Sequence, residues 1–159
     1  MIRSSILTLI LSSLLPVICL GQTPSSVSTE ARPAVAVVDR FFAALSEGDL
    51  EQVGSLLDPA VVILESGSAE NSAAEYLGGH AKGDVEFLKG AKHTLLRRTA
   101  HADGDTAWVA SESELVAQND GKPVTLASTE TMVLRSGKDG WKIVHIHWSS
   151  HVKKPGESH

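Results

Sequence analysis

Apolar residues recur at helical spacing in the first half of the chain and predict two helices there. Pro33 suits the first turn of a helix, and Gly48 suits the position just after its end. Asp49 and Gln52 form a capping pair that begins a second, short helix over residues 50–57. The first helix, expected over residues 33–47, has an apolar face made of Val37, Val38, Phe41, Phe42 and Leu45.

A buried strand and a third helix are predicted next. The run Val61-Val62-Ile63-Leu64 is apolar and rich in β-branched residues, which is typical of a buried strand. The sequence Ser72-Ala-Ala-Glu75 is a capping box and predicts the start of the third helix. Glycines between residues 78 and 83 weaken this helix by ~1 kcal/mol each relative to alanine, so it could break near Gly79.

Beyond Gly90 the pattern changes to long strands rich in threonine, valine, isoleucine and tryptophan. Short glycine- and aspartate-rich turns separate these strands and predict an antiparallel meander. Strands of this length must curl to cover the helices. The predicted fold class is therefore α+β, with three N-terminal helices packed on a strongly curved antiparallel sheet. The expected strands are Lys92–Ala102, Thr106–Ala117, Lys122–Arg135 and Trp141–Val152.

The hairpin turns determine which side chains share a face of the predicted sheet. A two-residue turn at Asp120-Gly121 places Ser111 opposite Glu130. The loop of the last hairpin could hold four or five residues, and we favour four, because this keeps the apolar residues of neighbouring strands together. His145 then lies opposite Glu130, and His147 shares the same face.

This face is apolar at one end and polar in its middle, as expected of a ligand pocket. His145 could act as a general base or acid, with Glu130 fixing its tautomer and His147 as a hydrogen-bond donor. The alternative is a purely structural role, in which the histidines satisfy one another or Glu130 in a wet cavity. The other pocket residues predicted on this face are Ser111, Met132, Ile143 and Trp141.

A second polar group comes from the third helix, which should cover the pocket mouth. Tyr76, His80 and Asp84 lie four residues apart and would share one face of that helix. Tyr76 could donate a hydrogen bond, and His80 with Asp84 could form a second acid–base pair. A transition metal held by His145, His147 and His80 is a minority possibility.

The first residues have the features of a cleaved export signal. A positive start is followed by an almost wholly apolar run over residues 6–20, with small residues just before Gln22. The run is shorter than a membrane span and contains Pro16. We therefore expect a periplasmic or secreted protein with no membrane contact after cleavage. Its segments would be a signal peptide over 1–21, a flexible leader over 22–32, one domain over 33–152 and a polar tail over 153–159.

Composition excludes some classes of function. With 159 residues, 42% of them hydrophobic, the chain suits one globular domain. Its formal net charge is −5 and its basic residues are scattered, which argues against a nucleic-acid surface. Cys19, its single cysteine, falls in the export signal, so the mature chain would have neither a disulfide nor a reactive thiol.

The order of elements, together with residues 36–67 and 104–150, resembles the nuclear transport factor 2-like (NTF2-like) superfamily. The resemblance is to its SnoaL-like polyketide cyclase and ketosteroid isomerase branch. It implies a cone, in which a curved sheet wraps helices around one deep pocket and its other face often forms a dimer. It also implies chemistry without metal or organic cofactor, in which a pocket aspartate or histidine moves a proton next to a carbonyl.

Two classes of function follow from these observations. The first is an enzyme that transfers protons on a small, partly apolar carbonyl compound, or hydrolyses it. The second is a non-catalytic dimeric module that binds a small ligand or a metal. Steroid isomerisation is not expected, because its aspartate, tyrosine and protonated acid find no counterpart around Tyr76, the single tyrosine. The apolar outer residues of the last strand, Val144, Ile146 and Trp148, predict a homodimer through that face.

Overall fold

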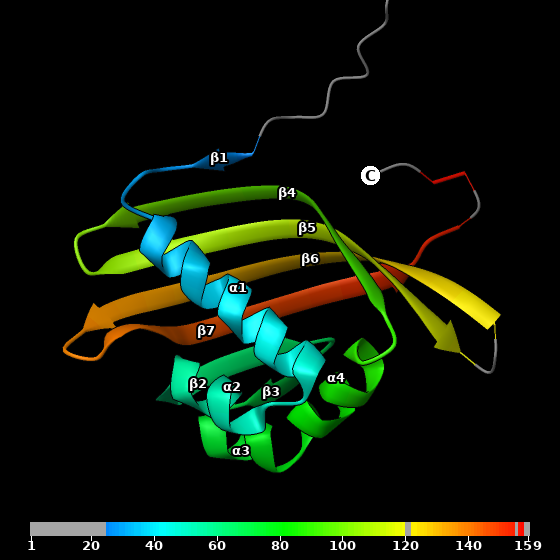
Figure 1. The fold of residues 1–159 in the computed structure, drawn as a ribbon, viewed down its shortest axis with the longest axis horizontal. Helices are drawn as coiled ribbons and strands as arrows, with labels where there is room; N and C mark the ends of the chain where they lie inside the picture. Colours follow the sequence, from blue (N-terminus) through cyan, green and yellow to red (C-terminus); the bar gives the residue numbers. More distant parts are fainter. Residues whose placement is uncertain (1–24, 120–121, 155, 158–159) are drawn as a thin grey trace, which may run out of the picture.

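The computed structural model describes residues 25–119, 122–154 and 156–157, and these form one curved seven-stranded sheet with helices on one face (Figure 1). The predicted α+β class is confirmed. The predicted signal peptide lies outside the described residues. None of the helices that the structure describes is long and apolar enough to cross a membrane.

The strand order in the sheet is β1-β4-β5-β6-β7-β2-β3. Strands β4 to β7 form the predicted antiparallel meander, but β2 pairs with β7 in parallel and β1 pairs with β4 in parallel. The sheet is therefore mixed, because β1 and β2 reach their neighbours through long connections rather than hairpins. The elements are β1 (Ser26–Val27), α1 (Arg32–Glu47), α2 (Leu50–Leu56), β2 (Leu57–Glu65), β3 (Ser68–Glu70), α3 (Ala73–Gly78), α4 (His80–Leu88), β4 (Lys92–Asp103), β5 (Thr106–Asn119), β6 (Lys122–Gly137) and β7 (Gly140–Val152).

The helices begin and end at the residues that the sequence marks. Gly48 ends α1 with φ 78°, in the left-handed region that glycine adopts without strain. The Asp49 carboxylate accepts a hydrogen bond from the Gln52 backbone N–H at 2.9 Å and caps α2. The third predicted helix does break at Gly79, which separates α3 from α4.

The core lies between α1 and the inner face of the sheet (Figure 1). Phe41 from α1 is fully buried, and so are Met132 from β6 and Ile143 and Ile146 from β7. Burying a side chain of this size contributes about 1.5–3 kcal/mol relative to leaving it in water. This packing fixes α1 over the sheet, and a pocket lies beside it toward α4.

The register of the β5–β6 hairpin is as predicted. Ser111 pairs with Glu130, and Val109 pairs with Met132. Both pairs therefore face the interior. Ser111 and Glu130 therefore lie on the same inner face of the sheet as the core residues Val109 and Met132.

The predicted register of the β6–β7 hairpin is wrong. Gly137 pairs with Gly140, so the turn holds two residues instead of four. Leu134 then pairs with Ile143 but Val133 pairs with His145, which makes Val144 the extra residue of a β-bulge. Since a one-residue shift moves every later side chain to the opposite face, His145 and His147 share a face with Val133 and Thr131, away from Glu130.

Candidate functional site

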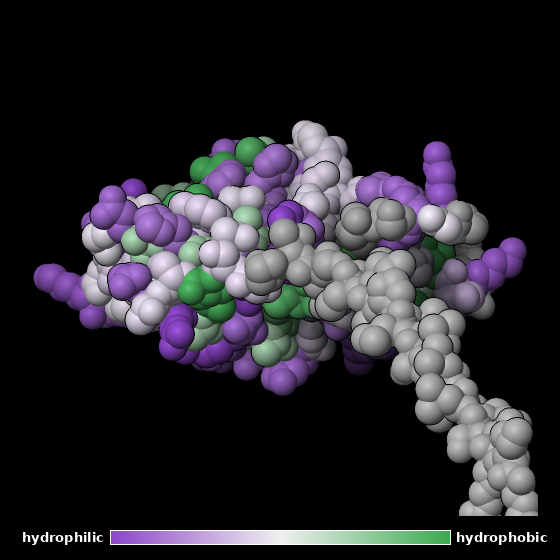
Figure 2. All heavy atoms as spheres, turned by 90° about the horizontal axis from the view of Figure 1, so that it is seen from above, coloured by the Kyte–Doolittle hydropathy of each residue, from purple (hydrophilic) through white to green (hydrophobic). Residues whose placement is uncertain are grey.

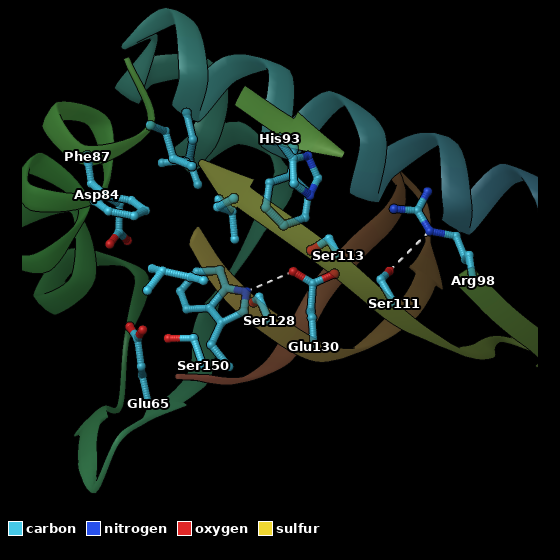
Figure 3. Close-up of a pocket in the computed structure, with 16 residues that line it drawn as sticks. Glu65, Asp84, Phe87, His93, Arg98, Ser111, Ser113, Ser128, Glu130 and Ser150 are labelled. Atoms are coloured by element: carbon cyan, nitrogen blue, oxygen red, sulfur yellow. Dashed lines mark hydrogen bonds between the residues drawn. The ribbon is translucent and has the colours of Figure 1, made fainter. Parts of the chain in front are cut away.

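A pocket lies between α1, α4 and the inner face of the sheet (Figure 3). It encloses about 710 Å³ of empty space, its open mouth included. Phe87 and Ser150, which are exposed, mark the open end beside α4, whereas Arg98 and Ser111 are buried at the other end, and His93 lines the pocket between the two ends (Figure 3). The remaining lining residues are Phe42, Leu45, Glu65, Asp84, Leu88, Ser113, Leu115, Leu126, Ser128, Glu130 and Trp148.

Glu130 places a carboxyl group in the middle of this pocket (Figure 3). Only 6% of the residue is exposed. The Trp148 indole N–H donates a hydrogen bond to Oε2 of Glu130 at 2.8 Å. Oε1 is buried and has no hydrogen-bond partner among the described residues. A buried, unpaired carboxylate oxygen is costly, so it indicates a position that a ligand or a proton occupies.

Burial raises the pKa of Glu130 from its ordinary 4.5 to about 7. The indole N–H of Trp148, the charge of Arg98 and the Ser111 hydroxyl act in the opposite direction, because all three favour the ionised carboxylate, but burial outweighs them. A carboxyl group with this pKa is present in both protonation states near neutral pH. This is the property that a general acid–base group requires.

Trp148 is held in position by two aromatic rings. It stacks on Phe41 with 6.2 Å between ring centroids, and the Tyr76 ring lies 6.1 Å away at a tilt. These contacts direct its indole N–H toward Glu130. Trp148 therefore orients the carboxyl group, a role that its prediction as an outer-face residue had missed.

The closed end of the pocket holds a compensated positive charge. The Arg98 guanidinium donates to Ser111 Oγ at 3.1 Å and forms an ion pair with Asp39 of α1 at 2.5 Å. Nearby, His93 stacks on Phe42 with 5.3 Å between ring centroids. Burial and the charge of Arg98 lower the pKa of His93, which keeps this ring neutral at pH 7.

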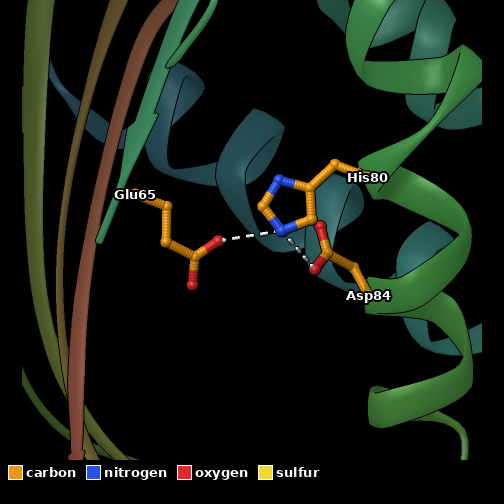
Figure 4. Close-up of side chains that lie close together, drawn as sticks. All are labelled: Glu65, His80 and Asp84. Atoms are coloured by element: carbon orange, nitrogen blue, oxygen red, sulfur yellow. Dashed lines mark ion pairs between the residues drawn. The ribbon is translucent and has the colours of Figure 1, made fainter. Parts of the chain in front are cut away.

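An acidic cluster surrounds His80 at the α4 side of the pocket (Figure 4). Its Nε2 lies 3.2 Å from Glu65 Oε2 and 3.6 Å from Asp84 Oδ1, and its Nδ1 lies 2.9 Å from Glu70 Oε1. Tyr76 donates a hydrogen bond to Asp84 Oδ2 at 2.7 Å. The predicted grouping of Tyr76, His80 and Asp84 is thus present, although α3 and α4 are separate helices.

The members of this cluster shift one another's pKa. Burial raises the pKa of Glu65, and the charge of Asp84 adds to it. Burial also raises the pKa of Asp84, more than the hydrogen bond from Tyr76 and the charge of His80 lower it. Burial alone would lower the pKa of His80, but Asp84, the hydrogen bond with Glu70 and Glu65 outweigh it and raise that pKa. The ring is therefore favoured as an imidazolium between carboxylates.

Glu65, His80 and Asp84 form a group that could hold a metal ion. Their ligand atoms lie within 4.8 Å of one another, which is found for no other such group in the part of the chain that the structure describes. A protonated His80 satisfies the same geometry through ion pairs. The metal ligands predicted from the sequence, His145, His147 and His80, are not brought together, because His145 and His147 lie on the outer face of the sheet.

The structure places the predicted site residues in three different environments. Ser111, Glu130 and Asp84 line the pocket. Tyr76 is buried behind it and His80 contacts Asp84. The placement of His145 and His147 in the pocket is wrong: His145 Nδ1 contacts the Val62 carbonyl oxygen at 2.9 Å, and His147 is exposed. Placing Met132, Ile143 and Trp141 in the pocket is also wrong, since they belong to the core or pack against it.

The sequence profile of the SnoaL-like domain matches residues 34–153. The chain belongs to the SnoaL-like domain family. A provisionally named ketosteroid isomerase from Shewanella frigidimarina NCIMB 400 is 33% identical with a TM-score of 0.71, over 79% of this chain and 100% of that one. None of the curated proteins matches the chain significantly.

Two further solved structures are similar in fold to this chain. The S. rosetta CaMKII hub is 26% identical with a TM-score of 0.66, over 78% of this chain and 98% of the hub. A provisionally named dehydratase of the NTF2-like family from Streptomyces avermitilis is 22% identical with a TM-score of 0.66, over 77% of this chain and 97% of that one. The predicted NTF2-like fold is therefore confirmed. The names of these neighbours indicate different functions, a dehydratase and a kinase hub.

Proposed function

We propose that this SnoaL-like protein transfers protons on a small, partly apolar carbonyl compound without a cofactor, and that Glu130 is its base. The observation that carries the proposal is the buried carboxyl group of Glu130, a residue that lines the pocket: its Oε1 has no hydrogen-bond partner among the described residues, and its pKa is raised to about 7. The 33% identity to the provisionally named ketosteroid isomerase supports the same class of reaction. His145, which faces away from the pocket, is replaced by Glu130 in this role.

The proposed reaction begins with the ionised Glu130. Its carboxylate takes a proton from the carbon next to the carbonyl group. The electron pair of that C–H bond forms a carbon–carbon double bond, and the π pair of the carbonyl moves to its oxygen. In a substrate with a carbon–carbon double bond next to the deprotonated carbon, this gives a dienolate, and the protonated Glu130 returns the proton to its far carbon. The oxygen pair re-forms the carbonyl and the carbon–carbon double bond moves into conjugation with it, which completes an isomerisation with no net gain or loss of atoms.

Two serine hydroxyls are placed to stabilise the charge that develops on the carbonyl oxygen. Ser113 of β5 pairs directly with Ser128 of β6, and both line the pocket beside Glu130 (Figure 3). A hydroxyl that donates to an enolate oxygen in a water-poor site lowers the barrier more than it would in water. Ser113 and Ser128 are therefore the proposed donors, in place of Tyr76, whose hydroxyl donates to Asp84.

A test of the proposal is proton exchange in D₂O. The protein is incubated with a panel of small cyclic and aryl ketones, and loss of the C–H signal next to the carbonyl is followed by proton NMR. Since the base must be ionised, the exchange rate should rise with pH, with a midpoint near 7, and level off above it. No exchange above the buffer rate for any ketone, or a rate that falls through this range, would contradict the proposal.

A non-catalytic binding module is the second candidate, favoured by the 26% identity to the CaMKII hub. The same pocket would then hold a ligand without turnover. Binding of a panel member, seen as a shift of the Trp148 indole signal, together with no exchange in D₂O would favour this candidate.

Export and dimerisation also remain proposals. Export is supported by the charged and apolar pattern of residues 1–21. The dimer was predicted from Val144, Ile146 and Trp148, but Ile146 is buried in the core and Trp148 lines the pocket. Trp108, 40% exposed, remains available for a dimer. Seen from the β1–β4 edge, the surface is mostly hydrophilic with small hydrophobic patches (Figure 2).

A further inference from the structure

We propose that the pocket selects compounds that carry a protonated amine on a small apolar body. The amine would lie at the open end, beside Glu65 and Asp84, and the carbonyl end beside Glu130. This inference rests on the proposed function, because it names the class of substrate for the same pocket.

The charged groups are distributed unequally along the pocket. Glu65 and Asp84 line the open end beside α4 (Figure 3). With Glu70, they place three carboxylates around the single imidazole ring of His80. Even when His80 is protonated, this end of the pocket has an excess of negative charge. A cationic group is therefore favoured here, and an anionic group is repelled.

The other cationic groups that line the pocket do not offset this preference. Arg98 is buried at the closed end, and its guanidinium is already paired with Asp39 and bonded to Ser111. His93 is kept neutral at pH 7, because burial and Arg98 lower its pKa. An anionic ligand would consequently find no uncommitted positive charge among the described lining residues.

Glu130 is an independent indication that the pocket takes a ligand. Glu130 lines the cavity, only 6% of the residue is exposed, and its buried Oε1 has no hydrogen-bond partner among the described residues. Apolar and aromatic residues line the pocket together with the serines. They would hold the body of the ligand, and they consist of Phe87, Leu88, Leu115, Leu126 and Trp148.

The carboxylates at the open end keep acceptor positions that a ligand can use. His80 Nε2 contacts one oxygen of Glu65 and one oxygen of Asp84, and an ionised carboxylate can accept several hydrogen bonds. An ammonium group beside these carboxylates would supply charge-assisted hydrogen bonds that water supplies only in part. The geometry thus gives a cation more than a weak surface attraction.

The experiment compares three probes with the same apolar body and different charge. Cyclohexylmethylamine, cyclohexylmethanol and cyclohexanecarboxylate are titrated into the full mature domain at pH 7.5, with EDTA present. The reporter is the Trp148 indole N–H in a proton–nitrogen NMR spectrum, assigned with Trp148→Phe. The amine should bind at least about tenfold more tightly than the alcohol, and the carboxylate more weakly than both.

Matched variants identify the source of the selectivity. A double variant, Glu65→Gln with Asp84→Asn, should reduce the preference for the amine over the alcohol to less than about threefold. Glu86→Gln removes the same charge from an exposed position of α4 and should leave the preference unchanged. Thermal unfolding of each variant shows whether it is folded at the temperature of the titration.

The inference is overturned if the alcohol or the carboxylate binds as tightly as the amine, or if the preference survives in the folded double variant. Its failure can be told apart from failure of the proposed function. Proton exchange on neutral ketones without amine selectivity removes this inference alone. If the protein prefers the amine but exchanges no proton on any amino ketone, the proposed reaction is wrong and the proposed amine-binding site still stands.

Discussion

Replacing Glu130 by glutamine should lower the rate of proton exchange by about 10²- to 10⁴-fold, the usual contribution of a positioned general base. Glutamine has nearly the same shape and can still accept the Trp148 hydrogen bond, but it cannot take a proton. The loss should therefore appear in the turnover of the bound substrate, with a small effect on its affinity. Single-turnover and steady-state NMR measurements with the best ketone of the panel separate the two.

The control for this variant is Glu112→Gln. Glu112 lies on β5 next to Ser111, on the outer face of the sheet, where it pairs with Arg97. Since that pair is partly exposed and lies away from the pocket side of the sheet, its loss should change stability and turnover little. Equal rates for Glu130→Gln and the wild type would show that another group is the base.

Glu130→Gln should also change how the free energy of unfolding depends on pH. The folded-state pKa of Glu130 is raised from 4.5 to about 7, so between these values the folded protein binds more protons than the unfolded chain. The stabilising contribution of protonated Glu130 is thus fully present below pH 4.5 and is lost as pH rises toward 7. Urea unfolding should show the variant gaining about 3 kcal/mol relative to the wild type between pH 4.5 and 8.

Trp148→Phe should raise the pKa of Glu130 further. Phenylalanine keeps an aromatic ring against Phe41 but removes the indole N–H that donates to Oε2. A hydrogen bond to a charged group contributes about 1.5–3 kcal/mol, which corresponds to about 1–2 pKa units. The midpoint of the rate-against-pH profile should move to higher pH by that amount.

Trp108→Phe, on the outer face of β5, is the matched control for Trp148→Phe. Trp108 is 40% exposed and pairs across the sheet with Val133, away from the pocket. Its replacement should leave the midpoint of the profile in place. A profile that is also unmoved in Trp148→Phe would mean that the indole does not position the Glu130 carboxyl group.

Much of the fold could be predicted because its signals are local. The end of α1 at Gly48 and the cap of α2 at Asp49 depend on residues within one turn of the helix. The β5–β6 register was predictable because Asp120-Gly121 is a strong turn signal in the sequence, and the observed hairpin places Glu130 beside Ser111 as predicted.

The β6–β7 register could not be predicted in the same way, because its strand is apolar on both faces. Ile143 points to one face of an unbroken strand, and the apolar residues Val144, Ile146 and Trp148 all point to the other face. An extra residue at Val144 therefore leaves no apolar side chain stranded in either register, and the pattern carries no signal for the bulge. This one residue places Trp148 in the pocket and both histidines outside it.

The acidic cluster was only half predictable. Four-residue spacing brought Tyr76, His80 and Asp84 together, because that spacing survives the break at Gly79. Glu65 and Glu70 come from the β2–β3 hairpin, which reaches His80 only through the folded arrangement of sheet and helices. Such long-range contacts leave no pattern in the sequence.

The central claim, that Glu130 is an acid–base group poised near neutral pH, is tested most directly by titrating its carboxyl carbon. The protein is labelled with ¹³C-glutamate, the Glu130 signal is assigned with Glu130→Gln, and its chemical shift is followed by NMR from about pH 4 to 9. A midpoint near 7 is the predicted result. A midpoint at the ordinary value of 4.5 would contradict the account, because an already ionised Glu130 would have no raised pKa with which to move protons.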